Sequence, residues 1–177
     1  IPARPASEAP CVYQHEWAGL QQAILPRHPE CRQLAQTLAA EDPGPRHLGQ
    51  VCRIFDHLRQ RWRYVDDPPG VDLPEAAPDL IRRKLIGDCD DFAVVTATLL
   101  TAIGAPVRYI KGYNGAQGHA WAEVYLGADT TAAAAYLRAR YAGQPVRFIR
   151  AANGDYWLNL DWSSRAPGGA RFAAQQG

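Results

Sequence analysis

Leu85-Ile86-Gly87-Asp88-Cys89-Asp90-Asp91-Phe92-Ala93 is the stretch that decides the fold, because a polar loop turns here into an apolar helix. Apolar residues continue at helical spacing as Phe92, Val95, Leu99, Leu100 and Ile103, and Gly104 is a typical stop. The second half of this helix carries no charge, which predicts that it lies buried. Cys89 stands at the helix N-terminus, where free N–H groups carry roughly half a positive charge and stabilise a thiolate.

The order of helices and strands indicates the fold class. Helical patterns come first, at about residues 16–25, from Pro29 to about 41, at 46–61 and at 79–85. After the Cys89 helix the period changes to two, which predicts strands at 107–113, 119–126, 146–152 and 155–161, with an inserted helix at 130–141. Helices followed by strands indicate an α+β fold in which the Cys89 helix packs on an antiparallel sheet.

An antiparallel pairing of residues 119–126 with 155–161 brings two polar side chains together. The first residue of one strand then lies opposite the last residue of the other, so His119 faces Asp161, with Cβ atoms about 5 Å apart. A thiol, an imidazole and a carboxylate in this arrangement are a nucleophile, its base and the group that orients the base. We therefore take Cys89, His119 and Asp161 as the candidate catalytic residues. Carboxylates beside Cys89 oppose a thiolate, so a nearby imidazolium is required.

Further residues are candidates for supporting roles. The N–H of Cys89 would supply half of an oxyanion hole, and Trp62 or Gln60 the other half. Asp88 is the expected N-cap, and Trp121 is a candidate for shaping a substrate groove. Asp88, Asp90 and Asp91 could also bind calcium, which predicts activity lost to chelators. They are too few and too close together to form a calcium site unaided, so we expect no cofactor.

Composition narrows the class of protein. The 177 residues carry a formal net charge of +1 and no run of Lys or Arg, which argues against a nucleic-acid surface. No apolar stretch approaches the roughly 18 residues needed to span a bilayer. The absence of Met predicts a truncated chain or a mature form whose leader or anchor has been removed, and slightly favours export over the cytoplasm. A disulfide between two of Cys11, Cys31 and Cys52 stays open, with Cys11–Cys31 the first choice.

Several segments together resemble the transglutaminase-like superfamily, in its bacterial form, on the papain-like cysteine protease fold. They are Gly87 to Ala93, Leu99 to Arg108, Gly112-Tyr113, His119 to Val124 and Trp157 to Asp161, with a lead-in from Ile54 to Pro68. The resemblance implies Cys89 as nucleophile, His119 as base and acid, and Asp161 as the orienting carboxylate. It also implies a catalytic domain at 46–164 with an insert at about 127–150, preceded by a linker and helical extension at 1–45 and followed by a flexible tail at 165–177.

The implied chemistry is acyl transfer from a peptide or protein amide through a thioester. Water as the second nucleophile makes a peptidase or amidase, and an amine makes a transglutaminase. The catalytic residues are the same in both cases, and we favour hydrolysis because water is always available. A catalytically silent protein-interaction module is the alternative from another class, which an ordinary or inaccessible thiol would favour.

Overall fold

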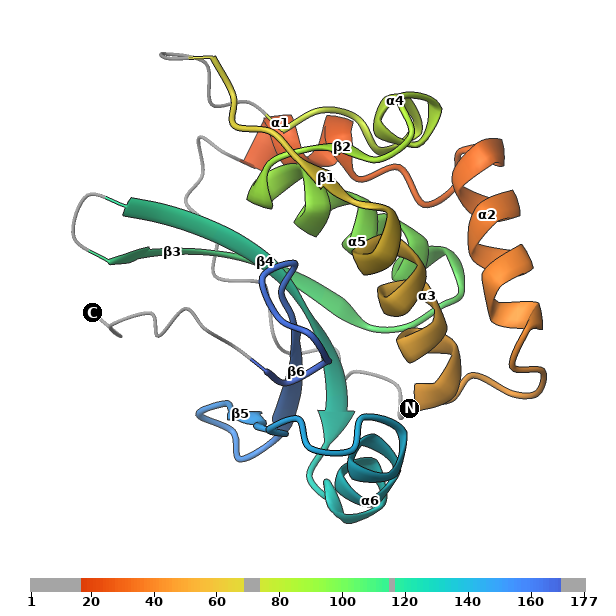
Figure 1. Ribbon diagram of the computed structural model, residues 1–177, viewed down its shortest axis with the longest axis vertical. Coiled ribbons are helices and arrows are strands. Elements are labelled where there is room, and N and C mark those ends of the chain that lie inside the picture. The colour runs from red at the N-terminus through yellow and green to blue at the C-terminus, as the bar shows by residue number, and fades with distance from the viewer. Residues whose placement is uncertain (1–16, 69–73, 115–116, 170–177) are drawn as a thin grey trace.

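Helix α5 (Cys89–Ala102) is the central helix of the molecule, and every residue from Asp90 to Leu100 is buried. It packs on strands β3 (Val107–Asn114) and β4 (Gln117–Gly127) and contacts α2 (Pro29–Ala40), α3 (Leu48–Arg61) and α4 (Ala77–Arg82). Figure 1 shows this arrangement in the computed structural model, which describes residues 17–68, 74–114 and 117–169. The absence of charge in the second half of the helix explains the burial, because an apolar helix surface is stable only against other protein.

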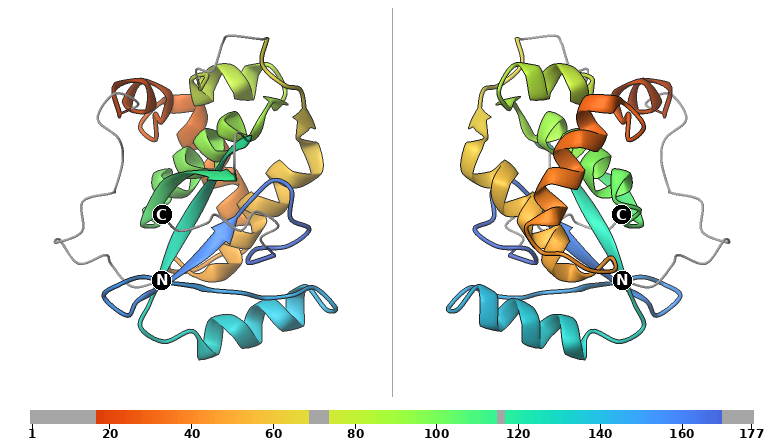
Figure 2. Two further views of the ribbon diagram at one scale, coloured as in Figure 1. Left: turned by 90° about the vertical axis from the view of Figure 1, so that its left-hand side faces the viewer. Right: turned by 90° about the vertical axis from the view of Figure 1, so that its right-hand side faces the viewer.

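The strands form a four-stranded antiparallel sheet in the order β3-β4-β6-β5, which confirms the predicted α+β class. Strands β6 (Tyr156–Leu160) and β5 (Ile149–Arg150) follow α6 (Thr131–Arg140), the inserted helix. Figures 1 and 2 place α6 at the opposite end of the molecule from α1 (Trp17–Ala23) and α4. The insert therefore extends the end of the sheet that is remote from the α5 N-terminus.

The register between β4 and β6 differs from the predicted one by two residues. Ala122 pairs with Leu160, so extending the ladder by one residue sets Trp121, and not His119, opposite Asp161. A shift of two leaves every side chain on its predicted face, because side chains alternate with a period of two. His119 and Asp161 are therefore diagonal neighbours on a common face, still within reach of each other.

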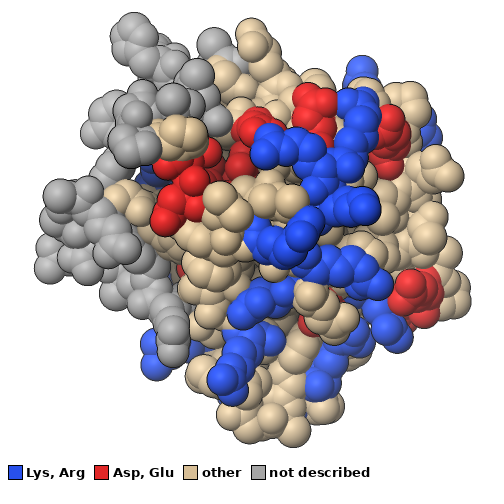
Figure 3. Space-filling view, turned by 45° about the horizontal axis from the view of Figure 1, so that its top comes forward, with Lys and Arg blue, Asp and Glu red and all other residues tan. Residues whose placement is uncertain are grey.

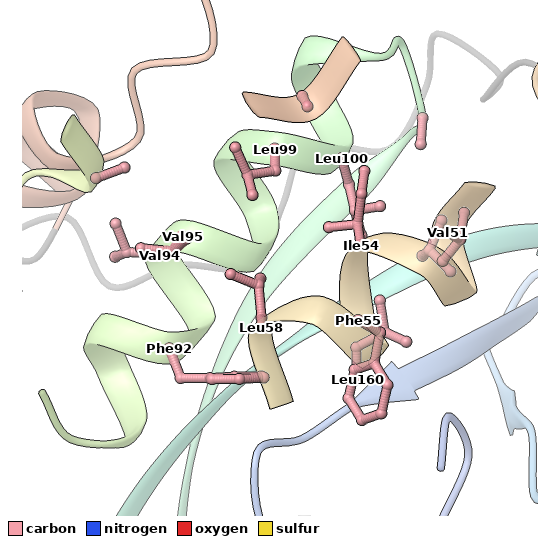
Figure 4. Packing of buried hydrophobic residues seen from close by; sticks show 14 of the residues in the cluster. Val51, Ile54, Phe55, Leu58, Phe92, Val94, Val95, Leu99, Leu100 and Leu160 are labelled. Carbon is pink, nitrogen blue, oxygen red and sulfur yellow. The ribbon is translucent and has the colours of Figure 1, made fainter. Parts of the chain in front are cut away.

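The core fills the space between the helices and one face of the sheet. Figure 4 shows side chains of α3 (Val51, Ile54, Phe55 and Leu58) meeting those of α5 and Leu160 of β6. Phe92 packs edge-on against both Phe55 and Trp62, with ring centroids 6.3 and 5.1 Å apart. These aromatic contacts lie one turn from Cys89 and fix the start of α5 against α3.

The helices before residue 46 pack in the same hydrophobic core as α3 and α5. The packing therefore shows no break at the boundary predicted between residues 45 and 46. Cys31 and Ala35 of α2 are fully buried in the cluster that contains α3 and α5. Cys31 and Cys52 are free thiols, and Cys11 lies outside the described residues. Burial raises the pKa of Cys31 to about 11 and that of Cys52 to about 12, which keeps both protonated and unreactive.

The chain after β6 is packed for as far as it is described, which differs from the tail expected from Arg165 onward. Ala166 is 1 % exposed, and the N–H of Gly168 donates to the carbonyl of Asn159 at 2.8 Å. The residues after Arg165 are small and show no apolar periodicity. The sequence therefore did not predict a packing that depends on backbone hydrogen bonds. Residues 170–177 lie outside the described residues.

The hairpin between β5 and β6 also has a longer connection than the two-residue turn that Asn153-Gly154 predicts. Ile149 pairs with Trp157 and Arg150 with Tyr156, which leaves residues 151–155 as the loop. Asn153 accepts the N–H of Asp155 through its side chain at 3.0 Å, and Gly154 adopts a φ of 90°. The dipeptide therefore still forms the turn, but inside a wider loop.

Candidate active site

Cys89 is the first residue of α5, as predicted, and it is partly exposed. Asp88 caps the helix by accepting the N–H of Asp90 at 3.1 Å. The carboxylate of Asp91, three residues after the cap, accepts the N–H of Glu75 at 2.9 Å. The thiol thus stands at a helix start with free N–H groups, held by one cap and one tertiary contact.

A short parallel pair of strands, β1 (Arg63–Tyr64) and β2 (Ile86–Gly87), supports the loop before Cys89. The carbonyl of Gly87 accepts the N–H of Val65 at 3.0 Å and the indole N–H of Trp62 at 3.2 Å. Trp62 is buried and its indole N–H is engaged by Gly87, so in this structure it supports this loop, and its role as an oxyanion donor stays a prediction. Gln60 lies exposed near the C-terminus of α3.

Gly87 allows Asp91 to approach the loop closely. A Cβ at position 87 would lie 2.2 Å from Oδ2 of Asp91. Asp91 is 3 % exposed. Burial, and then the charges of Asp88 and Glu75, raise the pKa of Asp91 to about 6 against the lowering effect of the Glu75 N–H. Position 87 therefore requires glycine, because a side chain there would overlap the buried carboxylate of Asp91.

We expect Gly87→Ala to destabilise the protein by about 1–3 kcal/mol, because the added methyl forces the buried carboxylate and the Cys89 loop apart. Urea unfolding measures the loss. Gly19→Ala is the matched control, since Gly19 lies in α1 and an added Cβ there would meet no heavy atom within 4 Å. That change is expected to be neutral or slightly stabilising. Equal effects of the two substitutions would contradict the packing of Gly87 against Asp91.

His119 and Asp161 form the predicted hydrogen bond, with 2.8 Å between Nε2 of the imidazole and Oδ2 of the carboxylate. Asp161 is fully buried and the His119 side chain is 12 % exposed. The second carboxylate oxygen, Oδ1, accepts the N–H of Ser163 at 2.9 Å. Both oxygens of Asp161 are therefore engaged, which fixes the carboxylate and the imidazole in one orientation.

The charge state of His119 depends on Asp161 and Cys89. Burial by itself lowers the pKa of His119, but hydrogen bonds to Asp161 and Cys89 and their negative charges raise it to about 9. A pKa of about 9 favours the protonated imidazole at neutral pH, and the hydrogen bond with the Cys89 thiol contributes to this rise. This imidazolium meets the requirement set by the carboxylates around Cys89.

A buried ion pair stands behind the imidazole. Trp121 stacks on His119, with ring centroids 5.8 Å apart, and donates its indole N–H to Oε1 of Glu123 at 2.7 Å. Arg108 binds Oε2 of Glu123 at 2.6 Å and lies over the ring of Trp157. Trp121 therefore orients His119 in this structure. The alternation of side chains in β4 places Glu123 on the same face as His119. A buried carboxylate requires a partner, so this pattern is the feature of the sequence that could have indicated these supporting residues.

We expect Arg108→Met to cost more stability than Glu123→Gln. The side chain of Glu123 is 2 % exposed, whereas that of Arg108 is 22 % exposed, so losing the arginine strands the more deeply buried charge. Breaking a buried pair in this way costs about 3–5 kcal/mol. Glu123→Gln keeps an acceptor for the indole N–H of Trp121, and the Arg108 guanidinium that it leaves unpaired is partly exposed to water. Denaturant unfolding of the two variants tests the order, and a reversed order would contradict the network.

Tyr64 and Trp162 form an aromatic pair beside the triad that sequence reasoning missed. Their ring centroids are 4.2 Å apart at 24°. Burial, and then the charge of Cys89, raise the pKa of Tyr64. Tyr64 pairs with Gly87 in β1–β2, and Trp162 follows Asp161. The stack therefore joins the Cys89 loop to the Asp161 loop, and only the tertiary fold brings the two residues together.

The acidic residues Asp88, Asp90 and Asp91 lie together, with one oxygen of each within 4.8 Å of the others. Asp88 and Asp91 already accept backbone N–H groups. Asp88 and Asp91 thus hold the Cys89 turn, and a calcium role for the three residues stays a prediction from the sequence.

Comparison with known proteins assigns the family. The chain matches the transglutaminase-like superfamily over residues 32–162, most of its length, and so belongs to that superfamily. None of the curated proteins compared with it matches. The match starts inside α2, in agreement with the packing of that helix in the common core. The superfamily includes cysteine-dependent enzymes, consistent with the geometry at Cys89.

Two solved structures share the fold. A candidate cysteine protease from Cytophaga hutchinsonii is 19 % identical with a TM-score of 0.52, over 88 % of this chain and 44 % of that one. The periplasmic domain of TgpA from Pseudomonas aeruginosa, bound to ethylmercury, is 21 % identical with a TM-score of 0.50, over 84 % of this chain and 48 % of that one. The chain thus spans less than half the length of either protein. Every helix in the described part of the chain is too short or too polar to cross a bilayer.

Proposed function

We propose that this protein cleaves peptide or protein amides through a thioester on Cys89, with water as the usual acceptor. The observation that supports the proposal most strongly is the hydrogen bond that fixes His119 on the buried Asp161, beside a thiol at a helix N-terminus. A thiolate–imidazolium pair is the resting state that acyl transfer to cysteine requires. The proposal assigns catalysis to the domain predicted at 46–164.

Each group has one role in the proposed cycle. The sulfur of Cys89 attacks the amide carbonyl and forms a C–S bond, while the Cys89 N–H stabilises the oxyanion. His119 then gives its proton to the leaving nitrogen as the C–N bond breaks. The neutral imidazole next takes a proton from water, whose oxygen attacks the thioester carbon. The C–S bond then breaks, which releases the acid and restores the Cys89 thiolate beside the protonated His119. Asp161 keeps the imidazole oriented and stabilises its positive form.

A periplasmic or otherwise exported location is part of the proposal, because the TgpA domain that shares the fold is periplasmic. Surface proteins or cell-wall peptides are then the expected substrates. An amine in place of water would convert the same thioester into a crosslink or an amide exchange, and only product analysis separates the two.

Product analysis in H₂¹⁸O tests the proposal. The protein is incubated with a peptide library and a labelled primary amine, with Cys89→Ala as the blank. Hydrolysis places one ¹⁸O in each new carboxylate, and transamidation places the amine in the product. We expect mainly ¹⁸O. Neither label above the blank, together with a thiol of ordinary reactivity, would favour the interaction module.

A further inference from the structure

A polar hollow of about 520 Å³ lies beside the loop that carries Asp161. Three arginines from separate segments line it, Arg59 of α3, Arg147 before β5 and Arg165 after β6, and we call it the arginine hollow. Ser163 and Gln144 add polar groups to its wall, and no Asp or Glu is among the lining residues that the structure describes. Its surface is therefore suited to an anion.

The arginine hollow is joined directly to the candidate active site. Asp161 binds His119 through Oδ2 and the N–H of Ser163 through Oδ1, and Ser163 lines the hollow. The carbonyl of the next residue, Ser164, accepts the Nε–H of Arg59 at 3.1 Å. A group bound in the hollow thus lies against the loop that carries Asp161 and so adjoins the partner of the imidazole.

Hydrogen bonds hold the walls of the arginine hollow in place. The N–H of Arg147 donates to the carbonyl of Gly168 at 3.1 Å, and the hydroxyl of Ser164 donates to the carbonyl of Gly169 at 2.7 Å. A Cβ at position 168 would lie 2.7 Å from the Arg147 carbonyl, so glycine is required there. The backbones that carry the arginines are therefore fixed before any ligand binds.

Two cations of the arginine hollow have no carboxylate partner within the described part of the chain. Within the described residues, Arg82, Arg83, Arg108 and Arg140 pair with carboxylates, whereas Arg147 and Arg165 form no ion pair. Figure 3 shows Lys and Arg gathered in a band across one face, although the formal net charge of the chain is only +1. Guanidinium groups bind carboxylates through paired N–H donors, which favours Arg over Lys at such a site.

We infer that the arginine hollow binds a carboxylate of the peptide substrate, either an acidic side chain or the C-terminal carboxylate. The inference rests on the proposed function for the identity of the occupant, because the hollow adjoins the loop that would orient the catalytic base. It makes this protein selective for peptides that present a carboxylate to the arginine hollow. A nucleic acid, the other common partner of arginine-rich surfaces, is an outcome that the test distinguishes.

Peptide binding to Cys89→Ala protein tests the inference without turnover. The probes are three fluorescein-labelled heptapeptides of Ala and Gly: one with a central Glu and an amidated end, one with Gln and an amidated end, and one with Gln and a free C-terminal carboxylate. Fluorescence anisotropy at low salt gives each dissociation constant. We expect at least one carboxylate peptide to bind about tenfold more tightly than the neutral peptide. Which one does so identifies the source of the carboxylate.

Substitution of the exposed arginines locates the binding. Arg147→Gln with Arg165→Gln should reduce the preference to within about twofold, and each single substitution should reduce it in part. Arg138→Gln on α6 is the control and should leave it unchanged. No preference at millimolar protein, or one that persists in the double variant, overturns the inference. So does a DNA oligomer that binds more tightly than the acidic peptides and depends on the same arginines.

The binding result is separate from the catalytic one. A carboxylate preference in a protein that cleaves nothing leaves the arginine hollow established as a peptide site and removes the proposed function. Cleavage with no carboxylate preference leaves the proposed function and removes the selectivity.

Discussion

His119→Ala is expected to lower kcat/KM for amide cleavage by about 10⁴-fold or more, because one change removes the base, the acid and the counter-ion of the thiolate. The imidazole is the only group in the described site that both contacts the thiol and is held by a buried carboxylate. Steady-state cleavage of a peptide selected from the library measures the loss. The fold is checked by thermal unfolding of the same samples.

His57→Ala is the matched control for this experiment. His57 lines a different hollow, with Leu34 and Ile81, and burial lowers its pKa. Its loss should leave kcat/KM within about threefold, the usual range for a residue that does not contact substrate. Activity of His119→Ala within about tenfold of the wild type would remove His119 from the mechanism.

Asp161→Asn is expected to lower kcat by about 10²–10⁴-fold while leaving the fold intact, because the amide keeps the shape but not the charge of the carboxylate. The pKa of His119 should fall from about 9 toward its ordinary value of 6.5, since Asp161 contributes both a hydrogen bond and a charge to the rise. A fallen pKa means less imidazolium at neutral pH, and so less thiolate at Cys89.

The pH profile separates an orienting role from a merely structural one. Activity of Asp161→Asn should be lost at a lower pH on the alkaline side than that of the wild type. Asp129→Asn, an exposed residue at the start of α6, is the control and should change neither kcat nor the profile. An unchanged alkaline limit in Asp161→Asn would mean that the carboxylate does not set the charge of His119.

The sequence predicted the fold class and the positions of the triad because these depend on strong local signals. The apolar surface of α5 and the alternation in β4 and β6 specify burial and facing directly. The error in register did not change the predicted site, because a shift of two residues keeps His119 and Asp161 on the same face of the sheet. The register itself was harder to predict, because α6 and β5 separate β4 from β6 and no tight turn joins the two strands.

Other features depend on contacts between distant segments, which sequence patterns do not report. The sequence does not show which acceptor the indole N–H of Trp62 binds. Only the fold shows that it donates to the carbonyl of Gly87. The stacking of Tyr64 on Trp162 and the arginine hollow likewise join residues that are far apart in the chain. The supporting residues were therefore harder to predict than the three candidate catalytic residues, to which the proposed function assigns the chemistry.

The most direct test of the account is the pH dependence of iodoacetamide alkylation at Cys89, followed by mass spectrometry in wild type and His119→Ala. Because the pKa of His119 is raised to about 9, the imidazolium that stabilises the thiolate persists below that pH and is lost above it. The account predicts fast labelling of Cys89 at about pH 6–7 in the wild type only, with the buried Cys31 and Cys52 unlabelled. Labelling that begins only near about pH 8.5, as for an isolated thiol, and is unchanged in His119→Ala would contradict it.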